Sequence, residues 1–197
     1  LTLNSLRDFR GDSDYQTALW MRNALRDHPI VRDLLQHGEP EKVITVSRDR
    51  ALLPLKGRLD WLGDAGIVEL KTATDARKDY FARDVRRYGY HVSAAYYRML
   101  ASEHTGTPAI DIPHTFVVVE TKPPYAVAIY HTGENLLDEG QSLWKTQLTR
   151  FDTCWITTTW PGYSVESLER VGRAGGKSGL PCEIEKGELE ELEELEL

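Results

Sequence analysis

The segment from residue 57 to 72 constrains the fold of this chain more than any other part of the sequence. It predicts two short strands joined by a tight Gly-Asp-Ala-Gly turn at 63–66. Side chains alternate between the two faces of a strand, so Glu69 and Lys71 point to one face and their neighbours point to the other, toward a core. If the hairpin closes, Asp60 on the first strand approaches Glu69.

Two carboxylates and one ammonium group around a single pocket indicate a particular chemistry. Mg²⁺ binds carboxylate oxygens, prefers octahedral geometry and keeps several waters, so a few protein ligands are enough. A lysine beside the ion can orient or activate a water molecule. The hairpin residues therefore favour a metal-dependent phosphodiesterase.

The composition is that of one globular domain. The chain has 197 residues and is 41% hydrophobic, enough for a sizeable core. No apolar run approaches the length of a membrane span, so we expect no membrane partner. Its two cysteines, Cys154 and Cys182, are too few for a disulfide framework and lack metal-ligand spacing, which favours a reduced, cytoplasmic compartment.

The net charge of −7 does not argue against nucleic-acid binding once it is located along the chain. Residues 181–197 hold eight glutamates and one lysine, and the rest of the chain holds 23 acidic and 23 basic residues. The acidity therefore belongs to the C-terminal segment, and the body of the protein is neutral.

The hydrophobic periodicity predicts a mixed order of helices and strands, typical of an α/β domain with a mixed central sheet flanked by helices. We expect one folded domain at 1–165, a glycine-rich linker at 166–180 and an acidic Glu/Leu tail at 181–197. The expected helices span residues 14–27, 29–38, 75–87, 88–102 and 134–154, and the expected strands span 43–47, the hairpin 55–72, 115–120 and 125–131.

These features resemble the PD-(D/E)XK nuclease superfamily, with Asp60 as the lone motif aspartate and Glu69-Leu70-Lys71 as the (D/E)XK element. The likeness is sharpest to the RecE-type phage and prophage exonucleases. Their Arg-Pro-Asp element is similar to the Gly-Arg-Leu-Asp-Trp-Leu run at 57–62, and their Tyr-His-Val-Gln-x-Ala-x-Tyr helix is similar to residues 90–97. The strand at 115–119 and the Trp-Pro pair at 160–161 follow in the expected order, so the resemblance covers residues 20–165.

The resemblance implies a PD-(D/E)XK nuclease domain at 1–165 and a Mg²⁺-dependent exonuclease that digests one strand of linear duplex DNA from the 5′ end. It also implies a homo-oligomeric ring, of three or four subunits, that works beside a single-strand annealing protein in recombination. Two alternatives remain open: a structure-specific or restriction-like endonuclease on the same core, and a catalytically weakened subunit for DNA binding or assembly.

Each element of the motif then has an expected role. Asp60 and Glu69 are expected to bind Mg²⁺, for which Mn²⁺ can substitute, with the Leu70 backbone carbonyl as a third protein oxygen. Lys71 is expected to hold or deprotonate the attacking water and to stabilise the charge that develops on phosphorus. Glu41 is either a water-mediated ligand or a solvated acid in the loop before a strand.

A basic stretch follows the second strand of the hairpin and could hold the DNA backbone. Its arginines at 83, 86 and 87 share one helical face, but they could equally pair with nearby aspartates. The expected DNA-binding residues are Arg77, Lys78, Arg83, Arg86, Arg87 and Ser93.

The sequence departs from the family pattern at two places. Ser93 stands where the family has glutamine, and its side chain reaches less far toward water or phosphate. The family also has a histidine or glutamate on an early helix, and nothing before Asp14 matches it, so either the chain begins downstream of that helix or the site lacks that ligand. The five histidines outside the helix at 90–97 have no metal-ligand spacing and are interpreted as structural or surface residues: His28, His37, His104, His114 and His131.

Overall fold

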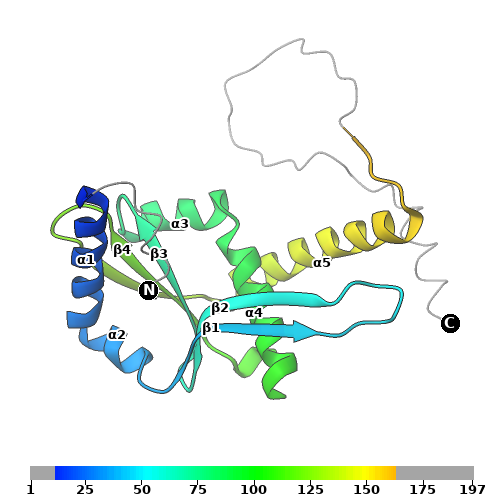
Figure 1. Cartoon of the computed structure of the whole chain (residues 1–197), viewed down its shortest axis with the longest axis horizontal. Coiled ribbons are helices and arrows are strands. Elements are labelled where there is room, and N and C mark those ends of the chain that lie inside the picture. Colours follow the sequence, from blue (N-terminus) through cyan, green and yellow to red (C-terminus); the bar gives the residue numbers. More distant parts are fainter. Residues whose placement is uncertain (1–11, 163–197) are drawn as a thin grey trace, which may run out of the picture. The chain divides into compact units, whose positions relative to one another are not determined.

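The computed structural model describes residues 12–162, and the chain divides after Trp160 into two units, Leu1–Trp160 and Pro161–Leu197 (Figure 1). The expected linker at 166–180 and tail at 181–197 lie outside the described residues. None of the helices within 12–162 is both long enough and apolar enough to cross a membrane.

The described elements follow the order that the sequence predicts. The helices are α1 (Asp12–Asp27), α2 (Pro29–Leu34), α3 (Lys78–Arg87), α4 (Tyr90–Thr105) and α5 (Glu134–Thr157), with the short 3₁₀ helix η2 (Ala109–Asp111) after α4. The strands are β1 (Gly38–Val46), β2 (Leu55–Gly63), β3 (Gly66–Ala73), β4 (His114–Glu120) and β5 (Val127–His131).

Several element boundaries differ from the prediction by a few residues, and three of them have a visible cause. The second helix ends at Leu34, and the chain enters β1 at Gly38, because residues 38–46 pair along β2 and backbone pairing overrides the weak local pattern. The third helix begins at Lys78, since the Asp75 carboxylate accepts a hydrogen bond from the Arg77 backbone N–H just before the first turn.

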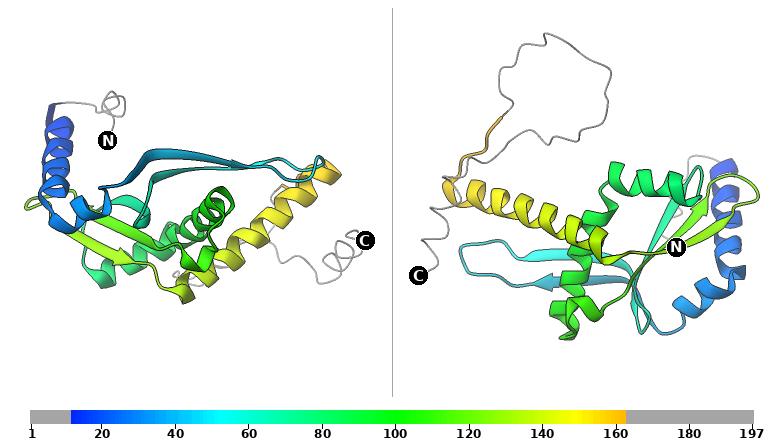
Figure 2. Two further views of the ribbon diagram at one scale, coloured as in Figure 1. Left: turned by 90° about the horizontal axis from the view of Figure 1, so that it is seen from below. Right: turned by 180° about the vertical axis from the view of Figure 1, so that it is seen from behind.

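The strands form one mixed sheet in the order β1-β2-β3-β4-β5. Neighbouring strands are antiparallel except for β3 and β4, which run parallel. A parallel pair needs a crossover connection, and α3 and α4 supply it. The crossover therefore places these two helices on one face of the sheet, directly after the strand that carries the (D/E)XK element (Figures 1 and 2).

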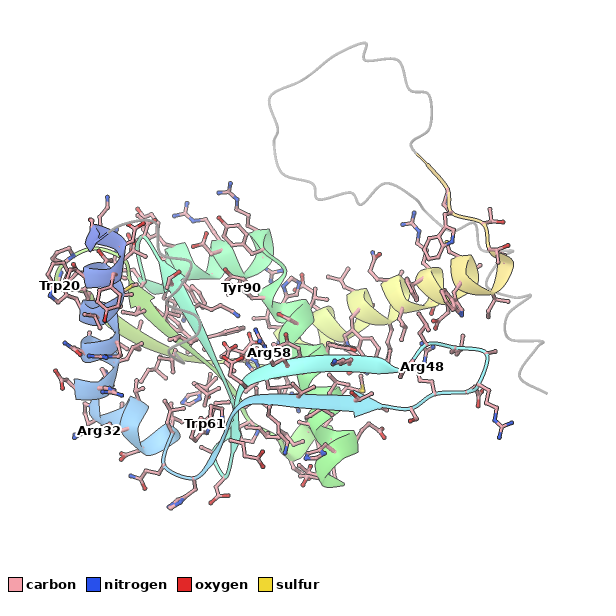
Figure 3. All side chains as sticks on the ribbon, in the orientation of Figure 1. Trp20, Arg32, Arg48, Arg58, Trp61 and Tyr90 are labelled. Carbon is pink, nitrogen blue, oxygen red and sulfur yellow. The ribbon has the colours of Figure 1, made fainter. Side chains whose placement is uncertain are left out.

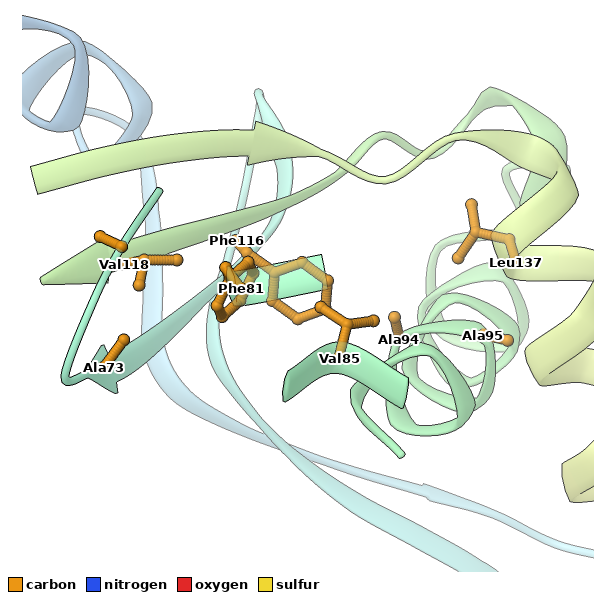
Figure 4. Close-up of a cluster of buried hydrophobic side chains, with 9 residues drawn as sticks. Ala73, Phe81, Val85, Ala94, Ala95, Phe116, Val118 and Leu137 are labelled. Carbon is orange, nitrogen blue, oxygen red and sulfur yellow. The ribbon is translucent and has the colours of Figure 1, made fainter. Parts of the chain in front are cut away.

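Each face of the sheet has its own core. One face packs against α1 and α2 through a cluster that includes Leu25, Val31 and Val117. The opposite face packs against α3, α4 and α5 around Phe81 (Figure 4). The Phe81 ring stacks on Tyr130 at 5.4 Å between ring centroids. This second face is the one that receives Glu69.

Beyond the sheet, the β1–β2 hairpin lies along α5. Arg48, at its far end (Figure 3), forms an ion pair with Asp152, and Trp155 donates a hydrogen bond from Nε1 to the Ala51 carbonyl at 3.2 Å. Trp144 of α5 packs against the core, whereas Trp155 is 42% exposed. The aromatic residues of this helix thus belong to the core near its start and are partly exposed near its end.

Candidate functional site

Asp60 lies where β2 separates from β3. The pairing of these strands runs from the Gly63–Gly66 turn only as far as Trp61 opposite Val68. One residue further along, the Asp60 carboxylate accepts a hydrogen bond from the backbone N–H of Leu70 at 2.9 Å. A side-chain oxygen takes the place of the next ladder hydrogen bond, so the exposed Asp60 is held beside the (D/E)XK segment.

Glu69 and Lys71 lie on the same face of β3, as the alternation predicts. The side chain of Glu69 is 1% exposed, and Lys71 Nζ lies 3.1 Å from its Oε2. Burial raises the pKa of the Glu69 carboxyl above its ordinary value; the Lys71 ammonium opposes this rise, and the Asp60 carboxylate adds to it. The carboxylate is therefore held away from solvent, with only part of its charge balanced.

Helix α4 covers the site on the face of β3 that carries Glu69 and Lys71. The ring of Tyr90 lies 4.9 Å from Lys71 Nζ, in a cation–π contact that fixes the ammonium (Figure 3). Seven residues later on the same helix, burial raises the pKa of the Tyr97 phenol, and the charges of Glu69 and Asp60 raise it further. Ser93, between the two tyrosines, donates its hydroxyl to the Tyr90 carbonyl at 3.0 Å.

His114 lies next to Glu69 from the neighbouring strand. Its side chain is fully buried, and its Nε2 lies 4.0 Å from Glu69 Oε2. Its Nδ1 lies 2.8 Å from the Thr132 hydroxyl. Burial, together with the positive charges of Lys71 and Arg98, lowers the pKa of His114 to about 3, so the imidazole is neutral at ordinary pH.

The carboxylates fit a magnesium ion, although their number is small. Within the part of the chain that the structure describes, no group of three or more His, Cys, Asp or Glu side chains could hold a metal ion. Glu69 Oε2 is nevertheless buried with no partner among these residues closer than Lys71 Nζ, and Asp60 presents a second carboxylate beside it. Two carboxylates, a backbone carbonyl and water would supply the oxygen ligation that Mg²⁺ requires.

The sequence predicts that Glu41 lies in a loop before a strand. In the structure it lies within β1. Its φ of 55° is left-handed, and its carboxylate pairs with Arg58 Nε at 3.0 Å. Figure 3 shows Arg58 on β2, two residues before Asp60. The charge of Glu41 is therefore engaged by a neighbouring strand.

The predicted DNA-binding residues of the basic stretch are exposed but differ in what they contact. Arg77 pairs with Asp75 at 2.6 Å, and Arg86 reaches across to Glu139 on α5 at 2.7 Å. Arg83 lies over the Tyr80 ring and Arg87 over the Tyr88 ring, and neither forms an ion pair within residues 12–162. Lys78, the first residue of α3, is also exposed.

Sequence reasoning did not identify two residues at this site, His114 and Tyr97. Tyr97 follows Ser93 by four positions, so helical spacing alone could have placed both on one face of α4. His114 carries no local signal, because its position beside Glu69 depends on the parallel register of β3 and β4, in which Glu69 pairs with Phe116.

A solved structure shares this fold. A protein from Eubacterium rectale that carries the description "putative exonuclease" superposes with a TM-score of 0.59 at 17% identity, covering 75% of this chain. This chain spans 55% of the length of that protein. The solved structure of SSO0001 has a TM-score of only 0.38 at 12% identity, over 77% of this chain and 71% of its own, which is too low to support an argument.

Comparison with curated proteins found no match. A family model, by contrast, matches residues 7–170, most of the chain, and the matched range contains every site residue named above. The superfamily expected from the (D/E)XK element is thus confirmed, whereas the narrower likeness to RecE-type exonucleases is not tested by these matches. The chain belongs to the family described as the PDDEXK-like domain of unknown function (DUF3799).

Proposed function

We propose that this protein is a magnesium-dependent deoxyribonuclease that acts as an exonuclease on linear duplex DNA. The observation that supports it most is the arrangement on β3: a buried Glu69 paired with Lys71, and an Asp60 carboxylate bound to the backbone between them. A surface hairpin of unrelated function gains nothing from burying an acid whose charge is incompletely balanced.

The backbone supplies a further oxygen. In an extended strand the N–H and C=O of one residue point toward the same neighbouring strand. Since the Leu70 N–H points to Asp60, the Leu70 carbonyl points to the same side, where the pairing with β2 has ended. The Asp60 carboxylate, the Glu69 carboxylate and this carbonyl would hold the ion.

A bound Mg²⁺ would neutralise charge on the scissile phosphate and lower the pKa of a water molecule. Lys71 then orients the attacking water and stabilises negative charge on phosphorus, and the Tyr90 ring limits where its ammonium can go. The burial of Glu69 excludes bulk water from one side of the site, which strengthens each electrostatic contact there.

The narrower features of the proposal follow the RecE-type resemblance. They are 5′→3′ polarity, replacement of Mg²⁺ by Mn²⁺, assembly as a ring and cooperation with a single-strand annealing protein in recombination. The exonuclease description of the Eubacterium rectale protein, which shares the fold, agrees with this choice.

One assay tests the activity. The protein is incubated with 5′-phosphorylated linear duplex DNA and with closed circular DNA, in Mg²⁺ or in EDTA. We expect loss of the linear DNA only, and no loss in EDTA. Asp60→Ala should reduce the rate on the order of 10³-fold, because several kcal/mol of charge stabilisation by the metal are lost.

Other outcomes identify the alternatives. Cleavage of closed circles would point to the endonuclease instead. Binding of DNA without cleavage in any metal would point to an assembly subunit, consistent with a Ser93 hydroxyl that already donates to a backbone carbonyl.

The exposed arginines that have no acidic partner within residues 12–162 are expected to bind the DNA backbone. Arg83→Ala and Arg87→Ala should each weaken DNA binding and reduce the slope of log affinity against log salt by about 0.9, the loss of one phosphate contact. Fluorescence anisotropy with a labelled duplex at several salt concentrations measures both quantities, with Asp60→Ala as the background to prevent cleavage.

Arg77→Ala is the matched control. Its guanidinium is bound to Asp75, so its removal should change the salt slope less than the other two substitutions. Equal slopes for all three variants would show that α3 does not contact the phosphates.

A further inference from the structure

His114, the first residue of β4, lies buried beside the Glu69 carboxylate and has no part in the mechanism described above. The ring makes an edge-on contact with Phe116, 4.7 Å between centroids, and its Nδ1 meets the Thr132 hydroxyl at 2.8 Å. These two contacts fix the plane of the imidazole. Its remaining nitrogen, Nε2, is thereby directed at Glu69 Oε2, 4.0 Å away.

The two atoms that face each other are incompletely satisfied. Within residues 12–162, His114 Nε2 is buried without a hydrogen bond, and Glu69 Oε2 has no partner closer than the Lys71 ammonium, 3.1 Å away in an ion pair. An unsatisfied buried polar atom costs about 1–3 kcal/mol, so a bare imidazole nitrogen beside a buried carboxylate that can accept a second donor is an unusual arrangement to retain. A movement of about 1 Å brings the two within hydrogen-bonding distance and satisfies His114 Nε2.

The protonation pattern of the ring determines what it can do. A neutral imidazole carries one N–H donor and one bare acceptor nitrogen. The Thr132 hydroxyl can donate to Nδ1, which leaves the proton on Nε2, directed at a carboxylate. In the opposite tautomer, a lone pair on Nε2 would face a carboxylate oxygen, and two acceptors repel.

We propose that His114 is a positioning residue that donates a hydrogen bond from Nε2 to Glu69 Oε2 and so fixes the orientation in which this carboxylate binds the metal ion. The inference rests on the proposed metal-dependent function. Groups that orient a metal ligand typically contribute roughly 10- to 100-fold to metal affinity.

Two substitutions separate this role from simple packing. In His114→Gln, the amide nitrogen can occupy the place of Nε2 and donate to Glu69; in His114→Asn, the shorter amide reaches only the place of Nδ1, near Thr132. Isothermal titration of the metal-free protein with Mn²⁺ should show binding weakened about 10-fold or more in the asparagine variant and by less than about 3-fold in the glutamine variant. Equal weakening in both, or none in either, would overturn the proposal.

A second threonine–histidine pair provides the matched control. His131 of β5 contacts the Thr115 hydroxyl through Nδ1 at 3.0 Å, but its side chain is exposed and does not reach Glu69. His131→Asn should therefore bind Mn²⁺ as tightly as the wild type. Equal losses in His131→Asn and His114→Asn would count against a specific role for His114.

Asp60→Ala distinguishes this inference from the proposed function. If the wild type shows no Mn²⁺ binding that Asp60→Ala removes, the metal site and the role of His114 both fail. If the wild type binds Mn²⁺ through Asp60 and His114→Asn binds it equally well, only the role of His114 fails.

The tautomer gives a measurement that does not depend on the folding of any variant. The chain has six histidines, so long-range ¹H–¹⁵N spectra of the wild-type protein can resolve each ring. We expect His114 to carry its proton on Nε2 with a bare Nδ1. A protonated Nδ1 with a bare Nε2 could not donate to Glu69 and would overturn the proposal.

Discussion

Glu69→Gln is expected to abolish DNA cleavage and at the same time to stabilise the metal-free protein. Glutamine keeps the shape of the side chain but removes the negative charge that the metal needs, so the cleavage rate should fall on the order of 10³-fold. The gain in stability follows from burial: at 1% exposure the carboxylate loses its hydration, and the raised pKa shows that Lys71 does not fully compensate.

Lys71 itself tolerates the substitution. Its side chain keeps 20% exposure and its contact with Tyr90, so its ammonium is not left as a buried, unpaired charge. We therefore expect the melting temperature of the metal-free variant to rise by a few degrees in calorimetry. A lower melting temperature would show that the ion pair stabilises the fold more than the desolvation of Glu69 destabilises it.

The pH dependence provides a second measure of the same effect. Above the ordinary glutamate pKa of 4.5 and up to the raised value in the folded protein, the folded state binds more protons at Glu69 than the unfolded state does. The free energy of unfolding therefore falls as pH rises through this window. Glu69→Gln lacks this contribution, so the difference between variant and wild type should grow from low to neutral pH.

Mg²⁺ should act in the opposite direction and favour the stability of the wild type over that of Glu69→Gln. Mg²⁺ binds the ionised carboxylate of the folded wild type and stabilises it by mass action, but it has little to bind in the variant. At neutral pH and millimolar Mg²⁺ we expect the free energy of unfolding of the wild type to rise relative to that of Glu69→Gln. No effect of Mg²⁺ on either protein would argue against a metal site at Glu69.

The sequence predicts the hairpin and the facing of its side chains because both depend on local chemistry. The alternation along β3 requires only that residues 66–73 be extended. The Gly-Asp-Ala-Gly turn at 63–66 favours a hairpin independently of the surrounding structure. The same holds for the order of elements, which follows from periodicity and from the short turns between them.

What the sequence does not predict depends on contacts between distant segments. The register between β3 and β4 places His114 beside Glu69, and no pattern within either strand specifies that register. Likewise, the sequence offers DNA phosphates or nearby aspartates as partners for Arg86, but its carboxylate partner is Glu139, 53 positions later on a helix that packs nearby. Charges on exposed helices therefore require the tertiary structure before a role can be given to them.

Gly140→Ala is expected to have the largest effect on stability, because at Gly140 α5 lies directly against the backbone of α4. A Cβ at this position would lie 2.1 Å from the carbonyl oxygen of His91 and 2.6 Å from its carbonyl carbon, both backbone atoms that cannot rotate away. The two helices would have to move apart at a cost of about 3 kcal/mol, more than the roughly 1 kcal/mol that alanine gains over glycine in a helix. Since His91 follows Tyr90, this movement would also shift the ring that holds Lys71 and so reduce cleavage.

Gly133→Ala is the matched control, since an added Cβ there has no heavy atom within 4 Å and φ is −73°. Urea denaturation should show a loss below about 1 kcal/mol for this variant, the range for a change of N-cap residue. A similarly small loss in Gly140→Ala would mean that α4 and α5 can separate without strain. In that case the close approach of the two helices would not be what positions Tyr90 over Lys71.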